Sequence, residues 1–106
     1  MGTFKHLSPR EAWAAYIKGA GILVDVRERD EANTSVDVKQ LYKVPFSELE
    51  QRLSELPTNR TVVFLSRVGN KSTDAARLLL KKGYSDVAVM EGGLTAWESE
   101  GLPVKG

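Results

Sequence analysis

The sequence predicts an α/β fold: a small parallel sheet of about five strands with helices on both faces, in one domain spanning residues 1–106. Two observations favour this fold class. Short runs that are apolar throughout, at 22–24, 62–65 and 87–90, are typical of parallel strands buried on both faces. Amphipathic stretches separate these runs, as they do in sheets whose strands are connected by helices.

The first half of the chain predicts one helix and two strands. The helix begins after Ser8, which is followed by a first-turn proline and a capping-box glutamate, and it ends at Gly19. A buried strand follows at 22–24. Residues 28–42 are polar and poorly periodic, so they predict no regular element. A short strand is expected at 43–45, closed by a proline.

The second half predicts three helices and two strands. Apolar residues spaced three and four apart over 46–56 indicate an amphipathic helix. A strand at 61–65 precedes a helix over 73–82, which is expected to bury Ala75, Ala76 and Leu79. A strand at 87–90 precedes a short helix over 94–97 that a later glycine stops.

Composition excludes several function classes. The net charge is +1, from 15 basic and 14 acidic residues, so bulk charge gives no support for a nucleic-acid or membrane partner. No apolar stretch approaches the ~18 residues of a membrane span, and no apolar leader follows Met1, so a cytoplasmic protein is expected. The chain has no cysteine, which excludes thiol catalysis, and a single histidine, so we expect no cofactor and no metal.

The candidate site is the loop Ser66–Ser72, which joins a buried strand to a helix. Backbone N–H groups converge in such a loop, and the helix N-terminus adds partial positive charge, so the loop is suited to binding an anion. A nucleophile would occupy its first position, which holds Ser66. The expected anion-binding residues are Arg67, Val68, Gly69, Asn70, Lys71 and Ser72.

Four segments in order resemble the single-domain rhodanese-like, or thiosulfate sulfurtransferase-like, family over about 8–104. They are Leu23–Glu28, Val44–Leu49, the loop Ser66–Ser72 and Glu91–Trp97, which matches a Gly-Gly-x-x-x-Trp signature. In that family the loop reads Cys-Arg-x-Gly-x-Arg-Ser. The resemblance implies a rhodanese-like fold and sulfur transfer, in which a cysteine thiolate takes a sulfane sulfur as a persulfide.

The chain departs from the family pattern in three places. Ser66 replaces the nucleophilic cysteine, and an oxygen cannot carry a persulfide. Lys71 replaces the usual arginine, which keeps the charge but loses the bidentate fork. The family's His-Ile-Pro-Gly-Ala-like motif is absent from 35–42. These departures predict that the chain does not transfer sulfur.

Supporting roles are expected for two residues at the end of the first buried strand. Asp25 and Arg27 are interpreted as structural residues that tie together the loops at the strand ends, whereas the charged segment 27–31 is expected to be a solvated surface. The two glycines of Gly92–Gly93 are attributed to backbone geometry or close packing.

Three hypotheses follow for the function. The first is a catalytically inactive rhodanese-like module that binds a small anion, such as sulfate or thiosulfate, or a protein partner through the loop. The second is a thiosulfate or persulfide sulfurtransferase whose cysteine at position 66 has been engineered to serine. The third is a purely structural domain. A phosphatase is disfavoured, because only four residues separate Ser66 from Lys71, one fewer than related phosphatases have.

Overall fold

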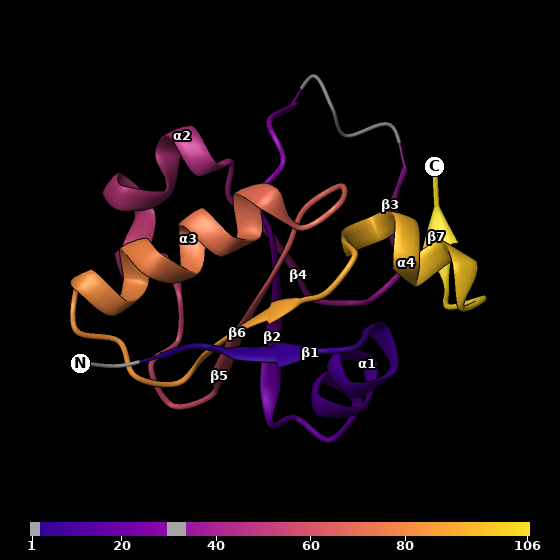
Figure 1. The fold of residues 1–106 in the computed structure, drawn as a ribbon, viewed down its shortest axis with the longest axis horizontal. Helices are drawn as coiled ribbons and strands as arrows, with labels where there is room; N and C mark the ends of the chain where they lie inside the picture. Colours follow the sequence, from indigo (N-terminus) through magenta and orange to yellow (C-terminus); the bar gives the residue numbers. More distant parts are fainter. Residues whose placement is uncertain (1–2, 30–33) are drawn as a thin grey trace.

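The computed structural model describes residues 3–29 and 34–106, and its main element is a five-stranded parallel sheet. The strand order is β1-β6-β5-β2-β4 (Figure 1). The strands are β1 (Lys5–Leu7), β6 (Val87–Met90), β5 (Thr61–Leu65), β2 (Gly21–Asp25) and β4 (Leu41–Lys43). The predicted α/β class is confirmed.

Helices cover both faces of this sheet. One face carries α2 (Phe46–Leu49), the 3₁₀ helix η2 (Glu50–Glu55) and α3 (Asn70–Lys81), and the other carries α1 (Pro9–Ile17) and α4 (Gly93–Ser99) (Figure 1). Two further strands, β3 (Ser35–Val36) and β7 (Val104–Lys105), form a separate antiparallel pair. None of the helices in 3–29 and 34–106 is long and apolar enough to cross a membrane.

The core has two layers because alternate residues of a strand point to opposite faces of the sheet. In β5, Val62 and Phe64 pack in the layer beneath α2 and α3, with Leu79 of α3. Val63 and Leu65 pack in the layer beneath α1 and α4. The central strands β5 and β6 therefore carry buried apolar residues on both faces over 62–65 and 87–90, which is the pattern that the sequence displays.

Helix α1 shows how local sequence fixes an element. The Ser8 hydroxyl accepts a hydrogen bond from the Glu11 backbone N–H at 3.1 Å, and the Glu11 carboxylate accepts one from the Ser8 N–H at 2.8 Å. This reciprocal pair is the predicted capping box. On the same helix, Trp13 packs edge-on against the fully buried Trp97 of α4, with ring centroids 5.7 Å apart.

The structure corrects several element boundaries. The strand expected at 43–45 is Leu41–Lys43, and the helix expected over 46–56 has one α-helical turn before it tightens to 3₁₀ geometry, broken by non-helical dihedral angles at Arg52. Helix α3 begins at Asn70 rather than at residue 73. Strands β1, β3 and β7 were not predicted, since two or three residues are too few to produce a period.

Candidate functional site

The loop Ser66–Ser72 lies at the carboxyl edge of the sheet, where ligands bind in parallel α/β folds. It follows β5, which pairs with β2 on one side and β6 on the other. The segments that leave those neighbouring strands, after Asp25 and after Met90, therefore flank the loop. This placement agrees with the position expected from the sequence.

A closed set of hydrogen bonds holds the Ser66 side chain inside the loop. Its hydroxyl oxygen accepts from the Gly69 backbone N–H at 3.0 Å, and its proton is directed to the Ser72 hydroxyl oxygen at 3.4 Å. Ser72 in turn donates to the Gly69 carbonyl at 2.9 Å. Ser66 is only 3% exposed and Ser72 is fully buried. The position of the family nucleophile is thus occupied by a hydroxyl that closes the loop on itself.

No base is placed to activate this hydroxyl among the residues that the structure describes. The proton of Ser66 goes to a neutral hydroxyl, and that hydroxyl's own proton goes to a carbonyl oxygen. The chain's one histidine, His6, lies on β1 with its Nδ1 3.6 Å from Glu91. A serine nucleophile requires an adjacent base. The described residues around Ser66 do not provide such a base, so they do not activate its hydroxyl as a nucleophile.

The N-terminus of α4 fixes the outer backbone of the loop. The carbonyls of Ser66 and Arg67 accept hydrogen bonds from the N–H groups of Leu94 at 2.8 Å and Thr95 at 3.2 Å. A Cβ on Gly93 would lie 2.3 Å from the Ser66 carbonyl oxygen, and Gly93 has a φ of +60°. The sequence attributed the two glycines to close packing, and at Gly93 this is confirmed.

The N-terminus of α3 differs from those of the other helices. Ser8 caps α1, Glu28 accepts hydrogen bonds at the start of α2, and carbonyls of the loop accept those of α4. The residue before α3 is Gly69, which has a φ of +112° and no side chain to cap with. Within 3–29 and 34–106, no acceptor meets the first N–H groups of α3 at Asn70 and Ser72. Asn70 is exposed, so its N–H is accessible to a ligand, whereas Ser72 is fully buried.

Two cations belong to the loop. Arg67 is exposed, and no carboxylate pairs with it in the described part of the chain. Lys71 is half-buried, and its Nζ lies 4.0 Å from the Glu28 carboxylate. The exposed Val68, at 55%, lies between Arg67 and Gly69. Positive charge, the open N–H donor of Asn70 and a helix N-terminus therefore coincide here.

Asp25 and Arg27 form a buried ion pair at the end of β2, each side chain 3% exposed. Arg27 donates from Nη2 to Asp25 at 2.9 Å and from Nε to both carboxylate oxygens, and Nη2 also donates to the Thr34 carbonyl at 2.6 Å. The pair thereby fastens the segment that leaves β2 to the segment that enters β3. The expectation that 27–31 is a solvated surface was wrong for Arg27, whereas Asp30 and Glu31 lie outside the described residues.

Nothing in the sequence indicates that Glu28 lies beside the loop. Its carboxylate accepts from the Ser47 hydroxyl at 2.7 Å and from the Ser47 N–H at 3.1 Å, in addition to its approach to Lys71. Contacts of this kind join separate elements, so the spacing of neighbouring residues in the sequence does not predict them. In the described part of the chain, no group of three or more histidine, cysteine or acidic side chains is placed to hold a metal.

The sequence is similar to those of known proteins. The family model described as the rhodanese-like domain matches residues 8–100. A sulfurtransferase of Allochromatium vinosum is 34% identical over 78% of this chain and 77% of its own length. The thiosulfate sulfurtransferase GlpE of Actinobacillus pleuropneumoniae is 25% identical over 97% of this chain and 94% of its own.

The fold is also similar to that of a solved structure. A rhodanese-related protein from Thermoplasma volcanium superimposes with a TM-score of 0.83, covering 96% of this chain and 98% of that one at 24% identity. At that identity the likeness concerns the fold alone.

Proposed function

This chain belongs to the rhodanese-like domain family, and on that premise we propose that it is a catalytically inactive member that binds a small anion in the loop Ser66–Ser72. One observation carries the proposal. The side chain at the nucleophile position is a buried hydroxyl that donates one hydrogen bond and accepts another inside the loop, while the N–H of the exposed Asn70, at the start of α3, meets no acceptor in the described structure.

The inactivity follows from the chemistry of the atom at position 66. Sulfur transfer needs a thiolate that attacks a sulfane sulfur and holds it as a disulfide-type bond. A thiol ionises with a pKa of about 8.5, which a loop of N–H donors lowers further. The Ser66 hydroxyl does not have a comparable acidity, and no base takes its proton among the residues that the structure describes. It also cannot form the sulfur–sulfur bond of a persulfide.

The anion-binding role rests on what remains when the thiol is absent. Arg67 supplies an exposed guanidinium, Lys71 supplies an ammonium, and the first turn of α3 supplies N–H donors and the positive end of the helix dipole. A tetrahedral oxyanion has enough acceptor oxygens to use several of these donors together. We therefore propose sulfate, thiosulfate or a similar ion as the class of ligand.

The test is a titration of the ¹⁵N-labelled chain with sulfate, thiosulfate and phosphate, followed by amide chemical shifts. The proposal expects saturable shifts at 67–72, weakened severalfold by Arg67→Gln. Arg77→Gln is the matched control, because Arg77 is an exposed arginine of α3 that lies outside the loop and pairs with Asp74. Shifts that are absent, or that both variants weaken equally, would contradict the proposal.

A second candidate is favoured by the names of the relatives, which are sulfurtransferases. In this reading the chain is a sulfurtransferase whose nucleophile has been replaced by Ser66, and restoring a cysteine restores transfer. A third candidate places a protein partner on the same face, where Val68 is exposed. It expects the loop to respond to that protein and to remain unshifted by inorganic anions.

A further inference from the structure

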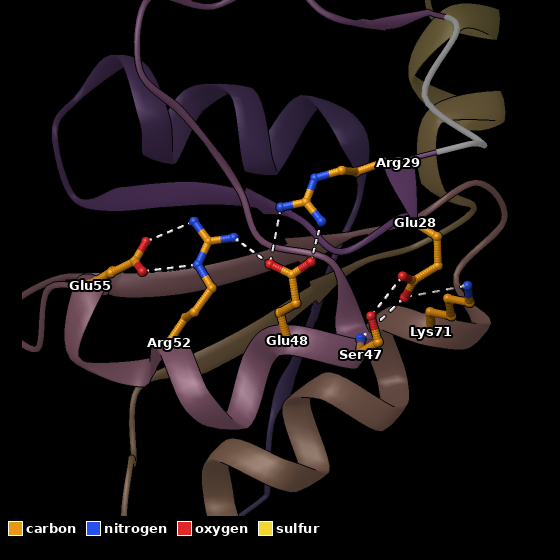
Figure 2. A network of polar contacts seen from close by, with 7 residues as sticks. All are labelled: Glu28, Arg29, Ser47, Glu48, Arg52, Glu55 and Lys71. Atoms are coloured by element: carbon orange, nitrogen blue, oxygen red, sulfur yellow. Dashed lines mark hydrogen bonds and ion pairs between the residues drawn. The ribbon is translucent and has the colours of Figure 1, made fainter.

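The Glu28 carboxylate is held in place by the start of α2. The Ser47 hydroxyl and the Ser47 N–H donate to its two oxygens at 2.7 and 3.1 Å (Figure 2). Pro45, the residue before α2, provides no capping side chain. Glu28 therefore performs this role from a distant segment, and its negative charge is favourable at a helix N-terminus.

The residue next to Glu28 is fastened to the same helix. Arg29 pairs with Glu48, Glu48 accepts from Arg52 at 3.0 Å, and Arg52 forms two hydrogen bonds with Glu55 (Figure 2). The hydrogen bond from Arg29 is the main cause that lowers the pKa of the Glu48 carboxyl. Two successive residues of the chain are thus bound to α2, which limits how far the Glu28 carboxylate can move.

The same carboxylate lies beside the loop. Its distance of 4.0 Å to the Lys71 Nζ places a fixed negative charge behind one of the two cations that an anion would contact. Building on the proposed anion site, we propose that Glu28 is its specificity-determining residue. It disfavours doubly charged anions more strongly than singly charged anions.

The size of the effect follows from Coulomb's law. An anion oxygen about 2.9 Å from the Lys71 Nζ, on the side opposite Glu28, lies about 7 Å from the carboxylate. At the dielectric constant of water this repulsion weakens the binding of one unit charge about threefold. The energy doubles for a dianion, so the factor is squared to roughly eightfold. Glu28 therefore weakens the binding of a dianion by a larger factor than the binding of a monoanion, and the ratio of the two factors can be measured.

The experiment compares sulfate with methanesulfonate, which presents similar oxygens with a single charge, at constant ionic strength. Dissociation constants are fitted from the amide shifts of 67–72 in the parent and in Glu28→Gln. The variant is expected to bind methanesulfonate about threefold and sulfate roughly eightfold more tightly. Glu55→Gln is the control, because it removes an equal charge from the end of the network where Glu55 pairs with Arg52, away from Arg29 and Lys71.

The outcomes distinguish a failure of the role of Glu28 from a failure of the anion site. If Glu28→Gln changes both anions by the same factor, or changes neither, the role of Glu28 is overturned while the anion site stands. If neither anion shifts the loop in any of the proteins, the anion site itself is overturned, and the role of Glu28 with it. Glu28→Ser, a second neutral replacement, has to change the sulfate-to-methanesulfonate ratio in the same direction, even where Glu28→Gln disturbs the fold.

Discussion

Replacing Gly93 by alanine tests how closely α4 approaches the loop. The new Cβ would lie 2.3 Å from the Ser66 carbonyl oxygen and 2.6 Å from the carbonyl carbon and oxygen of Arg67. These atoms cannot move away without loss of the 2.8 Å hydrogen bond from Leu94 to Ser66. The substitution therefore has to distort the loop, the start of α4, or both.

The cost has two parts. A φ of +60° costs an L-residue about 1–2 kcal/mol, and forcing an additional carbon into a packed site costs about 1–3 kcal/mol more. The free energy of unfolding should fall by about 2–5 kcal/mol. Gly101→Ala is the matched control, because Gly101 has a φ of +74° but no atom within 4 Å of the added Cβ. Only the first part, about 1–2 kcal/mol, applies there.

The assay is urea unfolding followed by circular dichroism. With a slope of about 1–3 kcal/mol per molar urea, Gly93→Ala should lower the midpoint substantially further than Gly101→Ala. The amide shifts of Leu94 and Thr95, which donate to the loop, should also move in Gly93→Ala. Equal midpoints in the two variants would refute the close approach of α4 to the loop.

Two further predictions concern charge. Arg27→Met should lower the free energy of unfolding in urea by about 3–5 kcal/mol, because it leaves Asp25 as an unpaired buried charge. Adding Asp25→Leu should recover part of this loss. An unchanged urea midpoint in Arg27→Met would contradict the buried pair. Hydrogen bonds from Arg29 and Arg52 lower the pKa of the Glu48 and Glu55 carboxyls, respectively. The two ionised carboxylates therefore make their full contribution to stability above the unfolded-state pKa of about 4.3. That contribution is lost as the pH falls through their lower pKa values in the folded protein. The urea midpoint should accordingly fall between pH 5.5 and pH 3, less so in Glu48→Gln and at high salt, and a midpoint that rises toward acid would contradict this linkage.

Much of the fold could be predicted because its evidence is local. Runs that are apolar at every position, such as 62–65, and the capping box after Ser8 are formed by residues close together in the sequence. The loop was found in the same way, since it follows a strand and precedes a helix. The edge strand β1 was missed, because its three residues include two that are exposed and carry no apolar run.

The parts that could not be predicted depend on contacts between distant segments. Ser47 and Glu28 are 19 residues apart, and nothing in either neighbourhood indicates that they meet. The burial of Arg27 was also missed, because a run of charged residues is typical of a surface. Only the pairing with Asp25 makes that burial tolerable.

The most direct test of the central claim is sulfur transfer by Ser66→Cys measured beside the parent chain. Both proteins are incubated with thiosulfate, and the intact mass is recorded before cyanide is added and thiocyanate is measured. The account predicts that the variant gains the mass of one sulfur atom as its thiolate displaces sulfite, and then forms thiocyanate, while the parent does neither. Thiocyanate from the parent above a boiled control would contradict the claim that Ser66 cannot transfer sulfur. A variant that gains no sulfur would contradict the claim that the loop is intact and lacks only the reactive atom.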